Sequence, residues 1–439
     1  MTKQKLITKI EKFYSLVNNE EDSRICKDIS DDACKYVPIN FFLIIASNTL
    51  TKLGDALGNP KTVLAWLMSY VNAPLYLISF LVPIRESGSM LPQIFIASYV
   101  RKKPLRKWIW VIGSILQFIS MAGIGLAAVL FNGATAGWII ILLLIMFSLS
   151  RGLCSVSSKD VMGKTIPKTR RGRLNGFSTA ISGILVLAAG LFMIFKREED
   201  LGIEFYGYLI LFAGALWILA AAIYSKIKEY PGETSGSEND FKDAIARLDL
   251  LKNDKPFRNF VIARSLLLCS ALTAPFYVVI AQSYLGKDVY ILGLFIIAGG
   301  IASSISAPIW GKMADESSKR VMIIAAMITS MLGISMFVIM TWVSFLSGLN
   351  WIYPFAFFIL GIAHSGVRLG RKTYIVDMAG GNKRTDYVAV SNTVIGFILL
   401  ITGGISALAS IISPEGIILV LSMFGLAGAY ASTKLPDVE

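Results

Sequence analysis

Arg85 and Glu86 stand side by side within an apolar run that extends from residue 73 to residue 100. A guanidinium binds anions through its fork of N–H donors, and a carboxyl group can take up and release a proton. If the chain turned at this pair, residues 87–100 would form a helix only about 21 Å long, which is too short to cross about 30 Å of hydrocarbon. The pair is therefore predicted to lie near the middle of one membrane-spanning helix.

A polar stripe continues from this pair along the same predicted helix. Glu86, Ser89 and Gln93 follow the spacing i, i+3, i+7 and share one helical face, while Pro92 can bend the helix. Charges at this depth cost at least about 2.5–3.5 kcal/mol each, so they usually face a bundle interior or a water-filled path. Two interpretations stay open: a substrate-binding stripe with Glu86 as proton carrier, or a buried ion pair that fixes helix packing.

Other apolar runs carry polar side chains at helical spacing. Asn48, Lys52 and Asp55 follow i, i+4, i+7 near the outer end of the run 38–57, where Lys52 and Asp55 could equally form a snorkelling surface pair. Arg151 lies on a serine-rich face of the run 137–160, and Arg264 lies about two turns into the run 257–283. We predict substrate contacts for Asn48, Arg151 and Arg264.

His364, Arg368 and Arg371 form a polar face in the run 351–377. His364 is the only histidine, and an imidazole with an ordinary pKa of about 6.5 suits proton coupling. The alternative is a hydrogen-bonded core histidine. Arg368 is predicted to bind substrate, whereas Arg371 could simply lie at the membrane interface.

The elements that would hold these residues are hydrophobic helices. The chain of 439 residues is 55% hydrophobic and 16% charged, with a mean hydropathy of +0.64, which is typical of a polytopic membrane protein. Twelve apolar runs could cross a membrane: 38–57, 73–99, 108–131, 137–160, 174–195, 205–225, 257–283, 289–311, 321–346, 351–377, 387–411 and 414–432. The fold class predicted is an all-α membrane protein.

A polar stretch divides these runs into two groups of six. The predicted parts are an N-terminal segment (1–37), a six-helix bundle (38–225), a linker with an amphipathic helix (226–256), a second six-helix bundle (257–432) and a tail (433–439). Apolar stripes within residues 6–17 and 241–251 predict amphipathic helices on the membrane surface or on the face of a bundle.

The basic residues predict the orientation. With the N-terminus in the cytoplasm, 33 of the 42 Lys and Arg residues fall in cytoplasmic segments, and the opposite loops hold only Lys61, Lys196, Arg197 and Lys287. This distribution follows the positive-inside rule, so both termini are predicted to be cytoplasmic, in a bacterial inner membrane. It also accounts for the net charge of +13 without a nucleic-acid partner.

Several other kinds of site are not indicated. The four cysteines lack metal-ligand spacing, so neither a disulfide framework nor a zinc site is expected. One histidine makes hydrolase chemistry improbable, and the run Gly163-Lys164-Thr165 lacks the first glycine of a phosphate-binding loop. We therefore expect no enzyme activity and no cofactor. The protein is also expected to be a monomer.

The chain resembles the major facilitator superfamily. The run GKMADESSKR, from Gly311 through Asp315 to Lys319 and Arg320, is similar to the loop motif of that family, and Arg151 is similar to the arginine of its fourth-helix motif. The counterpart loop at 97–107 keeps the basic cluster but has Arg101 where the family has an acid. The antiporter signature of the fifth helix is missing.

A weak internal repeat supports this resemblance. A shift of 217 residues aligns Arg151 with Arg368 and Asp160 with Asp377. The resemblance implies two pseudo-symmetric six-helix bundles and transport by alternating access. Asp160 and Asp377 are predicted to contact the other bundle and steady one conformation. The residues with a predicted gating role are Gly311, Asp315, Lys319, Arg320, Asp160 and Asp377.

The function predicted is secondary transport of a small anionic or amphipathic organic solute, with protons as a candidate coupling ion. Basic residues outnumber acids at the predicted site, where Arg85, Arg151, Arg264 and Arg368 face Glu86. When the two halves of the chain are aligned at a shift of 214 residues, Arg85 and Glu86 fall on Gly299 and Gly300. The N-terminal bundle would then supply the charged contact, and the C-terminal bundle would supply space at the same depth. Two alternatives stay open: a lipid or hydrophobic-compound transporter of the same fold, and a non-transporting assembly or sensor protein.

Overall fold

The computed structural model describes Tyr14 and residues 31–196, 201–232, 234, 247–378, 383–411 and 413–438. These residues form helices and connecting turns, with no strand among them. Nine helices in the described part are long and apolar enough to span a membrane. The predicted all-α membrane fold is therefore confirmed.

The first half of the chain forms one bundle. Its helices are α2 (Asp31–Cys34), α3 (Val37–Leu57), α4 (Val63–Tyr70), α5 (Leu75–Ile78), α6 (Leu81–Met90), α7 (Gln93–Arg101), α8 (Lys107–Leu130), α9 (Gly133–Thr165), α10 (Lys168–Phe195) and α11 (Ile203–Tyr224). We call it the N-bundle. Cys34 of α2 is disulfide-bonded, so the expectation of no disulfide was wrong at that residue.

The second half forms the C-bundle. Its elements are η1 (Arg247–Asp249), α13 (Leu250–Asn253), α14 (Lys255–Leu266), α15 (Cys269–Leu272), α16 (Ala274–Leu285), α17 (Val289–Trp342), α18 (Ser344–Ser347), α19 (Ile352–Met378), α20 (Lys383–Ala409) and α21 (Pro414–Thr433). The predicted amphipathic segments lie largely outside the described residues. Leu248 and Leu251, at the end of the second, pack against the C-bundle core.

The first crossing is broken rather than short. After α3 ends at Leu57, the five-residue segment 58–62 separates it from α4. Pro60 lies in this break and cannot donate a backbone hydrogen bond. The chain reaches the far end of the bundle only beyond α4, where the N–H of Gly133 donates to the carbonyl of Val71 over 2.7 Å. Lys61 is therefore inside the crossing, and its placement in an outer loop was wrong.

The second crossing is also broken, and it holds the charged pair that the sequence singles out. Arg85 and Glu86 lie within α6, so the chain does not turn there. Pro92 separates α6 from α7, where the sequence predicts a bend. Neither of these two crossings is among the nine spans, because α3, with 21 residues, is long enough but not apolar enough, and α6 and α7 are too short.

The long helix α17 comprises two predicted spans. Its backbone is non-helical at Ser317 (φ −164°, ψ 105°), so two helices meet there across a kink. The motif GKMADESSKR surrounds this kink. The nine candidate spans become ten when α17 is counted as two. The broken first and second crossings would bring the number to the predicted twelve.

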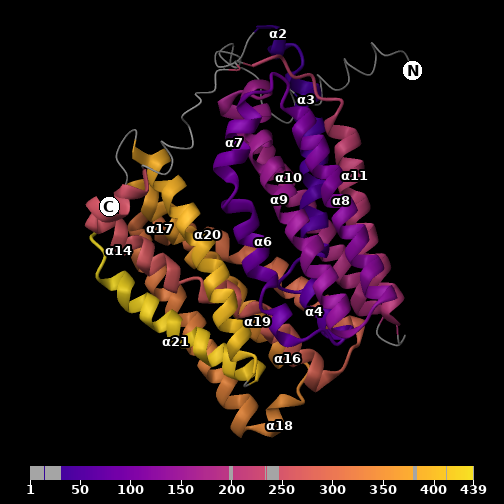
Figure 1. Ribbon diagram of the computed structural model, residues 1–439, viewed down its shortest axis with the longest axis vertical. Coiled ribbons are helices and arrows are strands. Elements are labelled where there is room, and N and C mark those ends of the chain that lie inside the picture. The colour runs from indigo at the N-terminus through magenta and orange to yellow at the C-terminus, as the bar shows by residue number, and fades with distance from the viewer. Residues whose placement is uncertain are drawn as a thin grey trace.

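Figure 1 shows the two bundles as separate groups of helices, indigo to magenta and orange to yellow. We call the side where α3 begins and α11 and α21 end the proximal side, and the side where α4 and α16 end the distal side. Near the distal side, Gln282 Nε2 donates to the Trp66 carbonyl (3.2 Å) and Lys287 Nζ to the Tyr70 carbonyl (2.9 Å). The hydroxyl of Tyr206 also donates to the Lys287 carbonyl, over 2.9 Å. The bundles are thus joined near their distal ends.

A pair of glycines brings the bundles into backbone contact. Gly190 of α10 faces Gly293 of α17, and a Cβ on Gly293 would lie 2.8 Å from the Gly190 carbonyl oxygen. Small residues permit such close approach between helices in a membrane, where packing supplies much of the attraction. This contact fixes how near the two bundles can come.

Candidate substrate-binding site

Asp55 joins two arginines from different helices. Arg85 Nη2 of α6 lies 3.0 Å from Asp55 Oδ1, and Arg151 of α9 pairs with the other carboxylate oxygen. The guanidinium of Arg85 also lies 4.8 Å from the centre of the Phe147 ring, a cation–π contact. We call Asp55, Arg85 and Arg151 the arginine triad.

Asp55 therefore does not form the surface pair with Lys52 that the sequence left open. Lys52 Nζ instead donates to Thr179 Oγ1 over 2.5 Å. The side chains of Asp55, Arg85 and Arg151 are 21%, 16% and 31% exposed. Charged groups in a crossing avoid lipid, so this partial exposure indicates that the triad borders the space inside the protein.

A second group of charges lies where the N-bundle meets the C-bundle. Lys61 Nζ, in the broken first crossing, is 2.9 Å from His364 Nε2 of α19. The carboxylate of Glu86 interacts electrostatically with Lys61, Arg85, Arg371 and Arg368. The name interface cluster is used below for Lys61, Glu86, His364, Arg368 and Arg371.

His364 is held from both ring nitrogens. Ser270 Oγ of α15 lies 3.2 Å from its Nδ1, opposite the contact with Lys61. His364 is thus a hydrogen-bonded residue within the fold, and its bond to Lys61 crosses between the bundles. The sequence left two alternatives for His364, a proton-coupling residue and a hydrogen-bonded core residue, and this geometry is compatible with both.

Arg264 occupies a different place from the other predicted binding residues. Its side chain is buried and donates to Ser391 Oγ (2.6 Å) and Asn392 Oδ1 (2.9 Å) of α20. These bonds join two helices of the C-bundle. The geometry therefore favours a packing role, and a substrate contact for Arg264 stays a prediction without structural support.

The remaining predicted binding residues lie on the helices that carry the two groups or, for Gln93, on the helix that follows α6. Ser89 Oγ donates to the Glu86 backbone carbonyl over 2.9 Å, so this hydroxyl is satisfied within α6. Asn48 on α3 and Gln93 on α7 are half-buried. Gly300 of α17 faces open space, whereas a Cβ on Gly299 would meet Phe357 at 3.6 Å.

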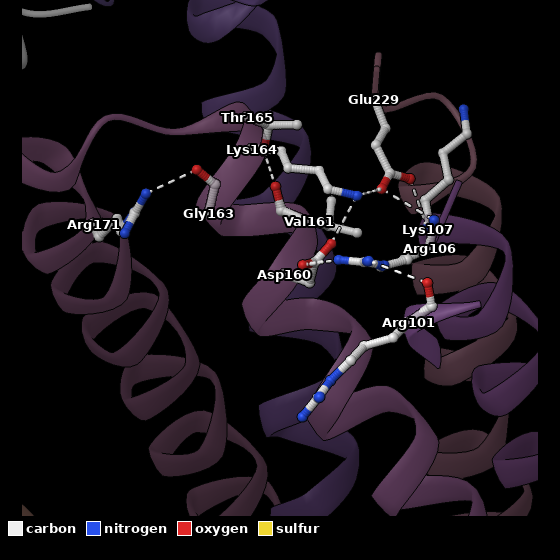
Figure 2. A network of polar contacts seen from close by, with 10 residues as sticks. All are labelled: Arg101, Arg106, Lys107, Asp160, Val161, Gly163, Lys164, Thr165, Arg171 and Glu229. Atoms are coloured by element: carbon white, nitrogen blue, oxygen red, sulfur yellow. Dashed lines mark hydrogen bonds and ion pairs between the residues drawn. The ribbon is translucent and has the colours of Figure 1, made fainter. Parts of the chain in front are cut away.

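Asp160 belongs to an ion network at the proximal side of the N-bundle (Figure 2). It pairs with Arg106 and, over 2.8 Å, with Lys164. These partners lie in the same bundle, so the inter-bundle contact predicted for Asp160 is not the contact that this structure shows. The network ties the turn before α8 to the end of α9.

Glu229 provides the second carboxylate of this network. Its side chain is fully buried and accepts hydrogen bonds from the backbone N–H groups of Arg106 (3.0 Å) and Lys107 (2.8 Å), as Figure 2 shows. Lys164 Nζ lies 3.3 Å from the same carboxylate. A carboxylate at a helix N-terminus satisfies free N–H groups and the helix dipole. The segment after α11 is thereby anchored to the start of α8.

The other predicted gating residues lie at the proximal side of the C-bundle. Asp315 and Arg320 flank the α17 kink and are exposed, and no atom lies within 4 Å of a Cβ built on Gly311. Lys319 Nζ pairs with Asp437 of the tail over 3.0 Å. Asp377 is exposed near the end of α19. Their gating roles stay predictions.

The sequence profile of the Major Facilitator Superfamily matches residues 38–404, which is most of the chain. The chain belongs to the major facilitator superfamily. A search of curated proteins gave no match. The resemblance drawn from the short motifs is thus confirmed, and the protein is an integral membrane transporter rather than an enzyme.

Solved structures of superfamily members have the same fold at low sequence identity. A D-xylose-proton symporter is 15% identical, with a TM-score of 0.68 over 91% of this chain and 99% of that one. A POT family transporter in complex with a conjugated peptide is 10% identical (TM-score 0.66; 89% and 94%). The nucleoside transporter NupG is 14% identical (TM-score 0.62; 90% and 99%).

Sequence reasoning missed residues that this superfamily fold brings to the centre. Asp55 is the partner of two arginines, and Lys61 is the N-bundle partner of His364. The signal for Lys61 was Gly58-Asn-Pro60, a helix-breaking run directly before a lysine. Because such a run usually marks a loop, it was interpreted as the end of the crossing.

The two groups together carry excess positive charge. Arg85, Arg151, Lys61, Arg368 and Arg371 face the carboxylates of Asp55 and Glu86, five basic residues against two acids. Within a membrane such an excess is unfavourable unless an anion or water compensates it. The arrangement is chemically suited to bind an anion between the bundles.

Proposed function

We propose that this superfamily member is a secondary transporter that moves a small organic anion across the membrane by alternating access. The observation that supports it is the excess of basic side chains over carboxylates in the arginine triad and the interface cluster. Guanidinium groups recognise carboxylate and phosphate oxygens by paired hydrogen bonds. A cationic substrate would add to the repulsion there.

The arrangement of the two groups suits alternating access. The arginine triad belongs to the N-bundle, whereas His364, Arg368 and Arg371 belong to the C-bundle. An anion held by residues of both bundles would draw them together, and its release would let them separate. Arg85, Arg151, Arg368 and Lys61 are the proposed anion-binding residues, with Asn48, Ser89 and Gln93 beside them.

A screen of the purified protein by thermal shift tests the substrate class. We expect organic anions to raise the melting temperature and matched neutral analogues to leave it unchanged. A substrate present at a concentration one hundred times its Kd stabilises the folded protein by about 2.7 kcal/mol. Anions that stabilise should then be taken up by proteoliposomes. Stabilisation by lipids or neutral apolar compounds alone would contradict an anion transporter.

Coupling to protons is proposed through Glu86. Its carboxylate lies among Lys61, Arg85, Arg368 and Arg371, so its protonation changes the charge that an anion meets. Replacing Glu86 with Gln should abolish uptake driven by a proton gradient and leave exchange of substrate for substrate. Uptake in proteoliposomes under an imposed gradient measures this. Persistent gradient-driven uptake in Glu86→Gln would exclude Glu86 as the carrier.

The proximal side is proposed to face the cytoplasm of a bacterial cell. With Lys61 now inside a crossing, the basic residues in the described part of the distal loops are Lys196 and Lys287, and Arg197 lies outside the described residues. The positive-inside rule is therefore followed more closely than the sequence suggested. Single cysteines at Asn132 and Lys434 should react with a membrane-impermeant maleimide in intact cells at the first position only. Labelling at position 434 and not at position 132 would show that the protein has the opposite orientation.

A further inference from the structure

The contact between Lys61 and His364 fixes how their protons are arranged. A charged Lys61 can only donate, so His364 Nε2 must accept across the 2.9 Å contact and the ring must be neutral. The ring proton then lies on Nδ1 and points to Ser270 Oγ, 3.2 Å away. Ser270 in turn donates to the Leu267 carbonyl over 3.1 Å. One unbroken chain of hydrogen bonds therefore starts at Lys61.

The charged groups around Lys61 and His364 favour a single positive charge on this pair and disfavour a second one. His364 interacts with Lys61, Arg371 and Arg368, all of which are basic, and Ser270 is its neutral neighbour on α15. Lys61 has Glu86 of α6 as its opposing charge. Arg85, beside Glu86, is occupied by Asp55. A second proton would turn Nε2 into a donor that faces the Lys61 ammonium, and the hydrogen bond would be lost.

The two partners belong to different bundles. Lys61 lies in the break of the N-bundle's first crossing, and His364 lies in α19 of the C-bundle. Moving the bundles apart on the distal side would separate the charges and relieve their repulsion. Protonation of His364 and opening of the distal side should therefore favour each other.

We propose that the Lys61–His364 pair is a proton-binding site that holds the distal side closed while it carries a single positive charge and opens it on gaining a second proton. Its place in a transport cycle rests on the proposed function. The structural response needs no substrate. A lower pH should thus increase the fraction of molecules that are open on the distal side, by up to about tenfold per pH unit for one proton.

The protonation state can be measured in the unsubstituted protein. Because the chain has one histidine, selective isotope labelling of histidine gives the nitrogen signals of one ring. In lipid bilayers at pH 8 we expect the neutral Nδ1–H tautomer, and as the pH falls we expect conversion to imidazolium. An Nε2–H tautomer at pH 8, or no titration down to pH 5, would overturn the proposal.

The opening can be measured by the distance between two spin labels. Asn132, between α8 and α9, and Thr341, near the end of α17, are exposed at the distal side of opposite bundles. With the four native cysteines replaced by serine, labels at these positions should show a longer-distance population that grows between pH 8 and pH 5. In His364→Asn, whose side chain does not titrate, this growth should disappear.

Glu86→Gln separates this site from the carboxylate proposed as proton carrier. The pH response of the label distance should persist in Glu86→Gln but move to lower pH, because the Lys61–His364 pair loses its nearby negative charge. A response retained in His364→Asn and lost in Glu86→Gln would assign the proton to Glu86 and overturn the proposal. Failure of every anion to be transported would contradict the proposed function, yet these distance and nitrogen measurements would still decide the role of the Lys61–His364 pair.

Discussion

At the scale of single residues, Asp55 explains how two arginines are accommodated in one bundle. Arg85 and Arg151 come from different helices, and each would leave an uncompensated charge inside the membrane without this carboxylate. Asp55 also occupies the guanidinium groups in the absence of substrate. A substrate carboxylate would have to replace or share these bonds.

Replacing Asp55 with Asn should destabilise the protein, because two guanidinium groups would then lie together without a counter-charge. We expect a loss of about 2–3 kcal/mol, below the ~3–5 kcal/mol of a fully buried pair because the side chains are partly exposed. Thermal unfolding in detergent measures the loss. The double change Asp55→Asn with Arg151→Gln should recover part of it.

Lys52 provides the control for this experiment. It lies one helical turn away on the same helix but contacts Thr179 rather than an acid. Lys52→Gln should change the melting temperature much less than Asp55→Asn does. Equal effects of the two substitutions would show that Asp55 has no special electrostatic role.

At the scale of elements, the contact between α10 and α17 controls how closely the bundles approach. A methyl group on Gly293 would meet the Gly190 carbonyl oxygen at 2.8 Å and Met193 Cβ at 2.9 Å. Real Cβ atoms avoid such distances, so the helices would have to move apart. The first helix of α17 thus uses glycine where the bundles meet.

Gly293→Ala should therefore slow transport by displacing the two helices. Gly183→Ala is a matched control, because it makes the same change in α10, seven residues before Gly190, where a Cβ meets open space. Both changes raise helix propensity by about 1 kcal/mol, so that effect cancels in the comparison. Initial uptake rates in proteoliposomes, normalised to the amount of folded protein, test this. Equal rates in the two variants would exclude a close-packing role for Gly293.

The broken helices are a second feature at this scale. The break at 58–62 places Lys61 beside His364, and the bend at Pro92 ends the helix that carries Arg85 and Glu86. Discontinuous helices in transporters commonly form the substrate and ion sites, since their irregular backbone lies inside the protein. Among the interrupted crossings of this chain, the first and the second bring Asp55, Lys61, Arg85 and Glu86 together.

At the scale of the whole molecule, the bundles are joined near the distal side by Trp66, Tyr70 and Tyr206 of the N-bundle with Gln282 and Lys287 of the C-bundle. The proximal network of Asp160 and Glu229, in contrast, lies within the N-bundle. Alternating access requires the distal contacts to separate in another state.

Holding the distal side closed should block transport. Cysteines in place of Tyr70 and Lys287, whose side chain reaches the Tyr70 carbonyl, should be joined by a short bismaleimide. Uptake should be lost after cross-linking, because the bundles could no longer rock apart on that side. Each single-cysteine variant treated with the same reagent is the control. Full uptake in the cross-linked double variant would contradict rocking about the interface described here.

The sequence alone determined the membrane fold and the position of Arg85 and Glu86 within a helix rather than a turn. These follow from apolar length and from charge distribution, which are local properties of the chain. Only the tertiary structure decided which charges meet. Asp55 and Arg151, or Lys61 and His364, are far apart in sequence, and a pairing between helices depends on rotation and depth that hydropathy does not encode. The run before Lys61 also has the composition of a loop, and only the packing of α4 beyond it shows that the crossing continues.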